Sequence, residues 1–146
     1  MKQVLEIDVF YKKKIMEEKH NNATPQRPEG ARPLDAGIIP IDIEKFCEQI
    51  KNEDAYHKNS KNAITVFKSD KVTITIIALQ ATQKFHPGNE ENEATMSLQV
   101  LKGNLHFESF GNEINLSDGE LLTLHQQLSF KATAINDVIC LLTMVK

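Results

Sequence analysis

The chain has 146 residues, which suits one domain built around one hydrophobic core. Hydrophobic residues make up 40% of it and the formal net charge is −3, so it lacks the excess positive charge of proteins that bind nucleic acids. Glu6 and Asp8 interrupt the first apolar run, and no later run is long enough to span a membrane. We therefore expect a cytoplasmic protein with no nucleic-acid or membrane partner.

Residues 1–40 are expected to form an N-terminal arm that precedes the folded domain. Positions 3–11, QVLEIDVFY, alternate apolar and polar residues as a strand does, although the pattern continued to Met16 also suits a helix. Four of the five prolines lie between His20 and Pro40, a composition that disfavours both a helix and a strand inside a sheet. Such an arm is long enough to add a strand to a second copy of the chain, so we expect a homodimer.

A helix is predicted after the arm, at the start of a domain expected over residues 41–146. Asp42 is a suitable N-cap, and the apolar residues that follow recur at helical spacing and form one stripe: Ile43, Phe46, Cys47 and Ile50. The two cysteines, Cys47 and Cys140, are far apart in the sequence and each lies in an apolar pattern. We expect both to be buried free thiols rather than a disulfide or a metal-binding pair.

From Asn62 onward the hydrophobic period changes from helical to two. Eight short β-rich runs alternate with tight turns such as KG, GN and SDG, and no helical run interrupts them. The runs are AITVFK, VTITIIAL, MSLQVL, NLHFES, EINL, ELLTL, SFKATA and VICLLTMV. This pattern predicts an all-β protein with an antiparallel sandwich or barrel.

The segment from Met96 to Leu124 resembles the cupin superfamily. An apolar pair with a turn glycine, a hairpin turn and an acidic-glycine turn follow one another in the family's order: Val100, Leu101, Gly103, Gly111, Asn112, Asp118 and Gly119. The resemblance covers residues 62–145, and RPLDAGIIPIDIEKF resembles the lead-in of small single-domain cupins. It implies a double-stranded β-helix, which is a jelly-roll barrel, here with an N-terminal arm and one short α-helix.

The resemblance also implies a metal site, and this chain lacks most of its ligands. In the family, a His-x-His pair, a glutamate and a later histidine point into the barrel and bind iron, manganese, nickel or zinc. In this sequence the glutamate position falls on Met96 and the later histidine on Phe130, while the pair falls within residues 89–92, NEEN. We therefore expect no bound metal and no other cofactor.

Three side chains could form an atypical metal site instead: His86, Glu90 and His125. Each lies in a loop or beside one, where exposure to solvent is the more frequent outcome. His106 stands between Leu105 and Phe107, so we expect it on the outer face of its strand. The sequence has no nucleophile spaced suitably from a base and no glycine-rich phosphate loop, so no catalytic residue is predicted.

The residues at the expected metal positions predict an apolar barrel interior. Because side chains alternate along a strand, an inward Met96 brings Leu98 and Val100 inward, and an inward Phe130 brings Ala132. These five either fill the barrel or line a pocket for a small, largely apolar ligand. We favour the pocket, in a metal-free cupin-like protein that is not an enzyme. The alternatives are a metal-dependent oxygenase or isomerase that uses the atypical site, and a dimeric interaction or regulatory subunit.

Overall fold

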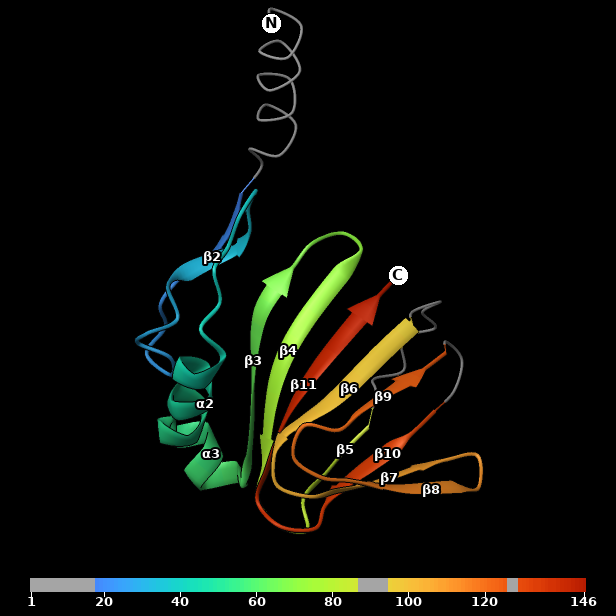
Figure 1. The fold of residues 1–146 in the computed structure, drawn as a ribbon. Coiled ribbons are helices and arrows are strands. Elements are labelled where there is room, and N and C mark those ends of the chain that lie inside the picture. Colours follow the sequence, from blue (N-terminus) through green and yellow to red (C-terminus); the bar gives the residue numbers. More distant parts are fainter. Residues whose placement is uncertain (1–17, 87–94, 126–128) are drawn as a thin grey trace, which may run out of the picture.

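The larger of the two main sheets has five antiparallel strands. A computed structural model, shown in Figure 1, describes residues 18–86, 95–125 and 129–146. The strands lie in the order β3-β4-β11-β6-β9. They are β3 (Lys61–Lys68), β4 (Val72–Leu79), β6 (Thr95–Lys102), β9 (Leu121–Leu124) and β11 (Val138–Val145). Strand β11 therefore occupies the middle of the sheet, between the β3-β4 hairpin and β6.

The smaller sheet has four antiparallel strands in the order β5-β10-β7-β8. They are β5 (Lys84–Phe85), β7 (Leu105–Ser109), β8 (Asn112–Leu116) and β10 (Lys131–Ala134). It forms the second layer of the molecule and shares a hydrophobic core with the larger sheet (Figure 1). All eight β-rich runs are strands, which confirms the all-β prediction, and the structure adds the two-residue strand β5.

The larger sheet has a hydrophobic cluster on each of its faces. In β4, Ile77 and Leu79 belong to the cluster between the two sheets, whereas Ile76 and Ala78 belong to a second cluster beside the helices. This division follows from the alternation of side chains along a strand, because successive residues point to opposite faces. The middle of the larger sheet is therefore covered on both sides.

All five residues predicted to point into the barrel are buried between the sheets: Met96, Leu98, Val100, Phe130 and Ala132. The ring of Phe130 stacks on the ring of Phe107 with their centroids 5.2 Å apart. It also meets the ring of Phe85 edge-on, with centroids 5.7 Å apart. Aromatic pairs of this kind add about 0.5–1.5 kcal/mol to what burial provides. Phe130 is thus the middle ring of a packed aromatic row.

The three turn glycines that carry the resemblance all adopt positive φ angles: 101° at Gly103, 77° at Gly111 and 82° at Gly119. A Cβ atom at Gly103 would lie 2.3 Å from the carbonyl oxygen of Asp137, so both φ and the lack of space require glycine at this turn. The Gly103 amide donates a hydrogen bond to Oδ1 of Asp118 at 2.6 Å. The turn after β6 therefore packs against the β10-β11 turn and bonds to the turn before β9.

Two helices pack on the face of the larger sheet that is turned away from the smaller one: α2 (Ile43–Asn52) and α3 (Asp54–Asn59) (Figure 1). Helix α2 begins as predicted, because the carboxylate of Asp42 accepts a hydrogen bond from the backbone amide of Lys45 at 3.1 Å. The predicted apolar stripe faces the sheet. Helix α3 was not predicted, because six residues are too few to show a helical period.

Both cysteines are buried free thiols, as predicted. Cys47 lies in the cluster beside the helices and Cys140 in the cluster between the sheets, so the larger sheet separates them. Burial raises the pKa of Cys140 to about 12, and it also raises the pKa of Cys47. Neither thiol is therefore poised to react as a thiolate.

Residues 18–40 contain a two-stranded ribbon. Strand β1 (Lys19–Asn21) pairs antiparallel with β2 (Arg32–Asp35), and Pro33 lies in the second strand. The expectation that this segment holds no strand is wrong. A strand that pairs on one side only can leave the N–H position of a proline unpaired, so the prolines do not prevent the ribbon.

An ion pair fixes the loop of this ribbon to the end of α2. Nη2 of Arg27 lies 2.9 Å from Oε1 of Glu53, and Glu53 also accepts hydrogen bonds from Gln49 and Asn62. Burial alone would raise the pKa of Glu53, but the hydrogen bonds from Arg27, Gln49 and Asn62 outweigh it, and the net shift of the pKa is downward. The carboxylate is therefore held ionised where the ribbon meets α2 and β3.

No helix in the part of the chain that the structure describes is long and apolar enough to cross a membrane. Residues 1–17, with the strand-like stretch that led us to expect a homodimer, lie outside the described residues. The homodimer, the cytoplasmic location and the domain boundary at residue 40 therefore stay predictions.

Replacing Phe130 by alanine should lower the free energy of unfolding by about 3–5 kcal/mol, because the change removes buried surface and leaves a cavity between two other rings. Phe130→Leu keeps more of the volume and should cost less. Chemical denaturation of both variants measures the difference. A loss below about 1 kcal/mol for the alanine variant would mean that the ring is not packed.

Candidate functional site

The positions that the cupin resemblance assigns to metal ligands do not fit a metal. Met96 and Phe130 are both buried in the apolar cluster between the sheets. A thioether and a phenyl ring cannot replace the carboxylate and imidazole that bind iron, manganese, nickel or zinc. Residues 89–92, where the His-x-His pair would fall, lie outside the described residues. Both positions that the structure describes are thus occupied by core residues.

The atypical site proposed from the sequence is only partly described. His86 follows β5 and His125 follows β9, and both side chains are exposed. Neither belongs to a group of three metal-ligating side chains within the described residues. Glu90, the third member of that site, lies outside them. The His86, Glu90 and His125 site therefore stays a prediction.

A pocket of about 350 Å³ lies where the edge strands of the two sheets approach each other. Its apolar walls come from β3, β4 and β5: Ala63, Ile77, Leu79 and Phe85. Ile77 and Leu79 are core residues, while the exposed Ala63 lies on the rim. The polar rim consists of Lys61, Asn62, Lys84 and His86. A pocket of this volume with mainly apolar walls is typical of small-molecule sites.

The structure joins this pocket to the interior predicted from the sequence through the aromatic row. Phe85 lines the pocket, and behind it Phe130 packs against both Phe85 and Phe107. Sequence reasoning missed Ile77, Leu79 and Phe85. The run VTITIIAL is apolar on both faces, so alternation alone did not show which face would look into the barrel.

A second hollow, of about 520 Å³, lies between the loop of the ribbon and α2. Most of its lining is charged or polar: Gln26, Glu29, Lys45, Glu48, Gln49, Asn52, Glu53 and Asp54. One of these groups, Glu53, is already bound by Arg27. The pocket of about 350 Å³ beside β5 therefore suits an apolar ligand better than this hollow does.

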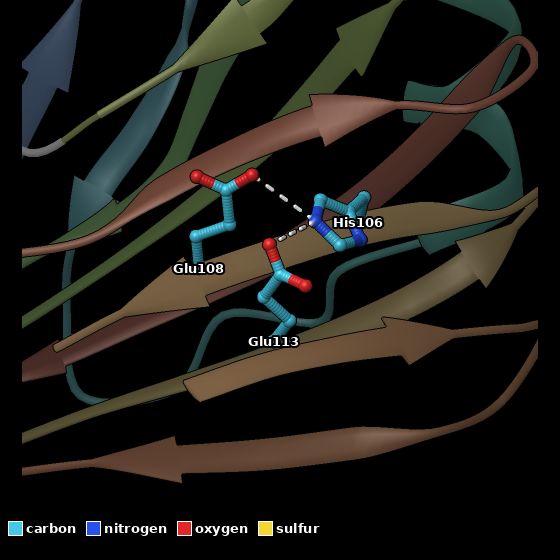
Figure 2. A group of neighbouring side chains, drawn as sticks. All are labelled: His106, Glu108 and Glu113. Atoms are coloured by element: carbon cyan, nitrogen blue, oxygen red, sulfur yellow. Dashed lines mark hydrogen bonds and ion pairs between the residues drawn. The ribbon is translucent and has the colours of Figure 1, made fainter. Parts of the chain in front are cut away.

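The outer face of the smaller sheet carries the one group of three metal-ligating side chains found within the described residues (Figure 2). Nε2 of His106 lies 3.1 Å from Oε1 of Glu108 and 3.8 Å from Oε1 of Glu113. The register of β7 and β8 brings these groups together, because it sets Glu108 opposite Glu113 and His106 opposite Asn115. His106 is on the outer face, as predicted, since Leu105 and Phe107 are buried.

The surroundings of His106 suit a protonated imidazole. Its Nδ1 lies 2.6 Å from Oδ1 of Asn115, and Nζ of Lys131 lies 3.5 Å from Oε2 of Glu108. The hydrogen bond to Asn115 raises the pKa of His106; partial burial opposes this, and Glu108 and Glu113 raise it further. A divalent cation could use the three ligand atoms, but it would have to displace the proton and compete with Lys131. The arrangement is accounted for as a surface ion-pair cluster.

Replacing His106 by glutamine should lower stability more at acidic pH than at alkaline pH. A group whose pKa is raised by folding contributes stability below its unfolded pKa of about 6.5, and this contribution is lost as pH rises through the folded pKa. Unfolding of wild type and His106→Gln from about pH 5 to about pH 9 measures it, with the exposed His125→Gln as control. A difference between wild type and His106→Gln that does not change with pH would contradict the ion-pair account.

No protein-family model matches the sequence, and no curated protein matches it. Several solved structures match. The cupin domain of Schizosaccharomyces pombe Cnp3 is similar with a TM-score of 0.60 and 9% identity over 88% of this chain and 87% of that one. A cupin superfamily protein from Desulfitobacterium hafniense DCB-2 has a TM-score of 0.59 and 14% identity over 87% of this chain and 97% of that one. An RmlC-like cupin from Desulfovibrio desulfuricans has a TM-score of 0.54 and 19% identity over 60% of this chain and 83% of that one.

At these identities the likeness concerns the fold alone. It agrees with the two antiparallel sheets, their shared core and the turn glycines described above. The chain therefore has the cupin fold, a jelly roll of the double-stranded β-helix type.

Proposed function

We propose that this protein is a metal-free, non-catalytic binding protein whose pocket beside β5 holds a small, largely apolar ligand. The observation that carries the proposal is the pocket of about 350 Å³ with walls of Ile77, Leu79, Phe85 and Ala63. Apolar walls remove hydrocarbon surface from water without asking for directional contacts, so they favour an apolar ligand of matching size.

The size of the pocket limits both the ligand and its affinity. A volume of about 350 Å³ holds on the order of ten non-hydrogen atoms, if each needs about the 30 Å³ that a water molecule takes up in the liquid. Ligands of this size gain between about 0.3 and about 1.5 kcal/mol per atom, the upper figure being reached only by the very smallest. At about 0.4–0.8 kcal/mol per atom, between these limits, about ten atoms give about 4–8 kcal/mol, which corresponds to dissociation constants from about millimolar to about micromolar.

The five interior residues predicted from the sequence have a supporting role in this proposal. All five share the buried cluster of the wall residues Ile77 and Leu79, and one of them, Phe130, also contacts Phe85 directly: the other four are Met96, Leu98, Val100 and Ala132. They hold the inner wall in place. That they themselves contact the ligand stays a prediction.

Filling the pocket from its exposed rim should abolish binding and leave the fold intact. Ala63→Trp adds a large ring at an exposed lining position, so the core residues need not move. Thr123→Trp is the matched control, because Thr123 is exposed on β9 at the opposite edge of the same sheet. Neutral fragments of about ten non-hydrogen atoms are the probes, and calorimetry and thermal unfolding are the measurements.

At a concentration about a hundred times its dissociation constant, a bound fragment stabilises the native state by about 2.7 kcal/mol. This should raise the melting temperature of wild type and Thr123→Trp by roughly 5–10 °C, and that of Ala63→Trp not at all. Equal binding to Ala63→Trp and wild type would show that the ligand lies elsewhere.

The metal-free part of the proposal has its own test. Elemental analysis of protein purified without chelator should find no stoichiometric metal, because Met96 and Phe130 offer no ligands. Iron(II), manganese, nickel or zinc added separately to chelator-treated protein should leave the melting temperature unchanged within error, whereas tight binding would raise it by roughly 5–10 °C.

Three variants assign any metal that does bind. Loss of a zinc effect in His106→Ala would place the ion on the outer face and leave the barrel metal-free. Near-stoichiometric metal that disappears in His86→Ala or His125→Ala would instead support the metal-dependent enzyme. The metal-dependent enzyme and the dimeric interaction subunit stay predictions.

A further inference from the structure

We propose that the ligand of the pocket beside β5 is an amphipathic acid, with an apolar body and one carboxylate that Lys61 and Lys84 bind. This inference rests on the proposed function. Both lysines line the pocket, Lys61 at the start of β3 in the larger sheet and Lys84 in β5 of the smaller sheet. The two lysines thus belong to different sheets. No aspartate or glutamate lies among the described residues that line the pocket.

Neither lysine is committed to another ion pair within the described residues. The lysines that do form ion pairs there are Lys19, Lys58 and Lys131. The carboxylate of Glu53, which is hydrogen-bonded to the neighbouring Asn62, is paired with Arg27 at 2.9 Å. The ammonium groups of Lys61 and Lys84 therefore give the rim a positive charge, and no carboxylate within the described residues forms an ion pair with either of them.

Asn62 is not available to bind the ligand, because both polar atoms of its side-chain amide already make hydrogen bonds within the protein. Its Nδ2 donates to the carbonyl oxygen of Ile50 at 3.0 Å and to Oε1 of Glu53 at 2.9 Å. Its Oδ1 accepts from the backbone amide of Ala63 at 2.9 Å and from Nη2 of Arg27 at 3.3 Å. The lysines are thus the charged groups that the lining offers to an anion.

The division of the lining fixes the orientation of the ligand. Ile77, Leu79 and Phe85 form the apolar wall, whereas Lys61 and Lys84 are exposed. An acid would lay its hydrocarbon part against the wall and keep its carboxylate at the rim, where it stays partly hydrated and loses little solvation free energy. A lysine ammonium has three donors on a flexible stem, so the two lysines can hold a carboxylate without a fixed geometry.

The ligand class is therefore a monocarboxylate of about ten non-hydrogen atoms. An aliphatic chain and an aryl-substituted chain both meet this description. Heptanoate and phenylpropanoate are the two probes, and the corresponding primary amides are their uncharged partners. Comparing each acid with its own amide measures the contribution of the charge, because shape and apolar surface stay the same. Comparing the two acids identifies the hydrocarbon that the pocket prefers.

The experiment measures the four dissociation constants by calorimetry at low salt, with wild type and the double variant Lys61→Gln/Lys84→Gln. Wild type should bind each acid at least about fivefold more tightly than its amide, which is the upper range for one exposed ion pair. The double variant should bind acid and amide within about twofold of each other, and salt should reduce the preference of wild type. Lys68→Gln/Lys71→Gln is the control, since it removes the same charge from exposed positions that do not line the pocket.

Each outcome has a separate meaning. Equal binding of acid and amide to wild type would overturn the carboxylate and leave the proposed function standing. A preference that survives in Lys61→Gln/Lys84→Gln, or that is lost in Lys68→Gln/Lys71→Gln, would overturn the assignment to these two lysines. If the acids and amides do not bind wild type but neutral fragments bind it and are lost in Ala63→Trp, the inference alone fails; if the neutral fragments do not bind either, the proposed function fails with it.

Discussion

The fold depends on strand β4, which must bury both of its faces. Ile77 and Leu79 need the smaller sheet on one side, and Ile76 and Ala78 need a second cover on the other. Burial of this kind stabilises a fold by about 25 cal/mol for each Å² of apolar surface removed from water. The helices α2 and α3 supply the second cover, and the ribbon is fixed to them through Arg27 and Glu53. Residues 18–60, which precede β3, are therefore a structural part of the molecule.

The pocket lies at the corner where the smaller sheet no longer covers β4. The larger sheet extends to β3, whereas the facing sheet ends at β5, which has only two residues. Ile77 is thus covered less completely at this corner than Leu98 and Val100 are further along the sheet. An apolar wall and a charged rim meet there because a core strand lies next to the exposed ends of β3 and β5.

Most of the fold could be predicted from the sequence, because alternation and turn glycines are local signals. The eight strands that match the β-rich runs, the capped helix α2 and the burial of Met96 and Phe130 follow from them. Strand β5 and helix α3 are too short to show a period, and the ribbon forms in a segment whose prolines argue against strands. The pocket depends on where two sheets end, which no local pattern records.

The cluster around His106 could have been predicted from the sequence, because a tight turn at Gly111 places His106 opposite Asn115 and Glu108 opposite Glu113.

The position of β11 in the sheet affects how the chain folds while it is being synthesised. Strand β11 pairs with β4 on one side and with β6 on the other, although both are made well before it. While the ribosome still holds β11, the β3-β4 hairpin and β6 each have a long apolar edge without its partner. Contacts between residues so far apart in sequence form slowly, and open edges of this kind pair readily with other chains. The edges of β4 and β6 are therefore open to other chains until the central strand is available to pair with both.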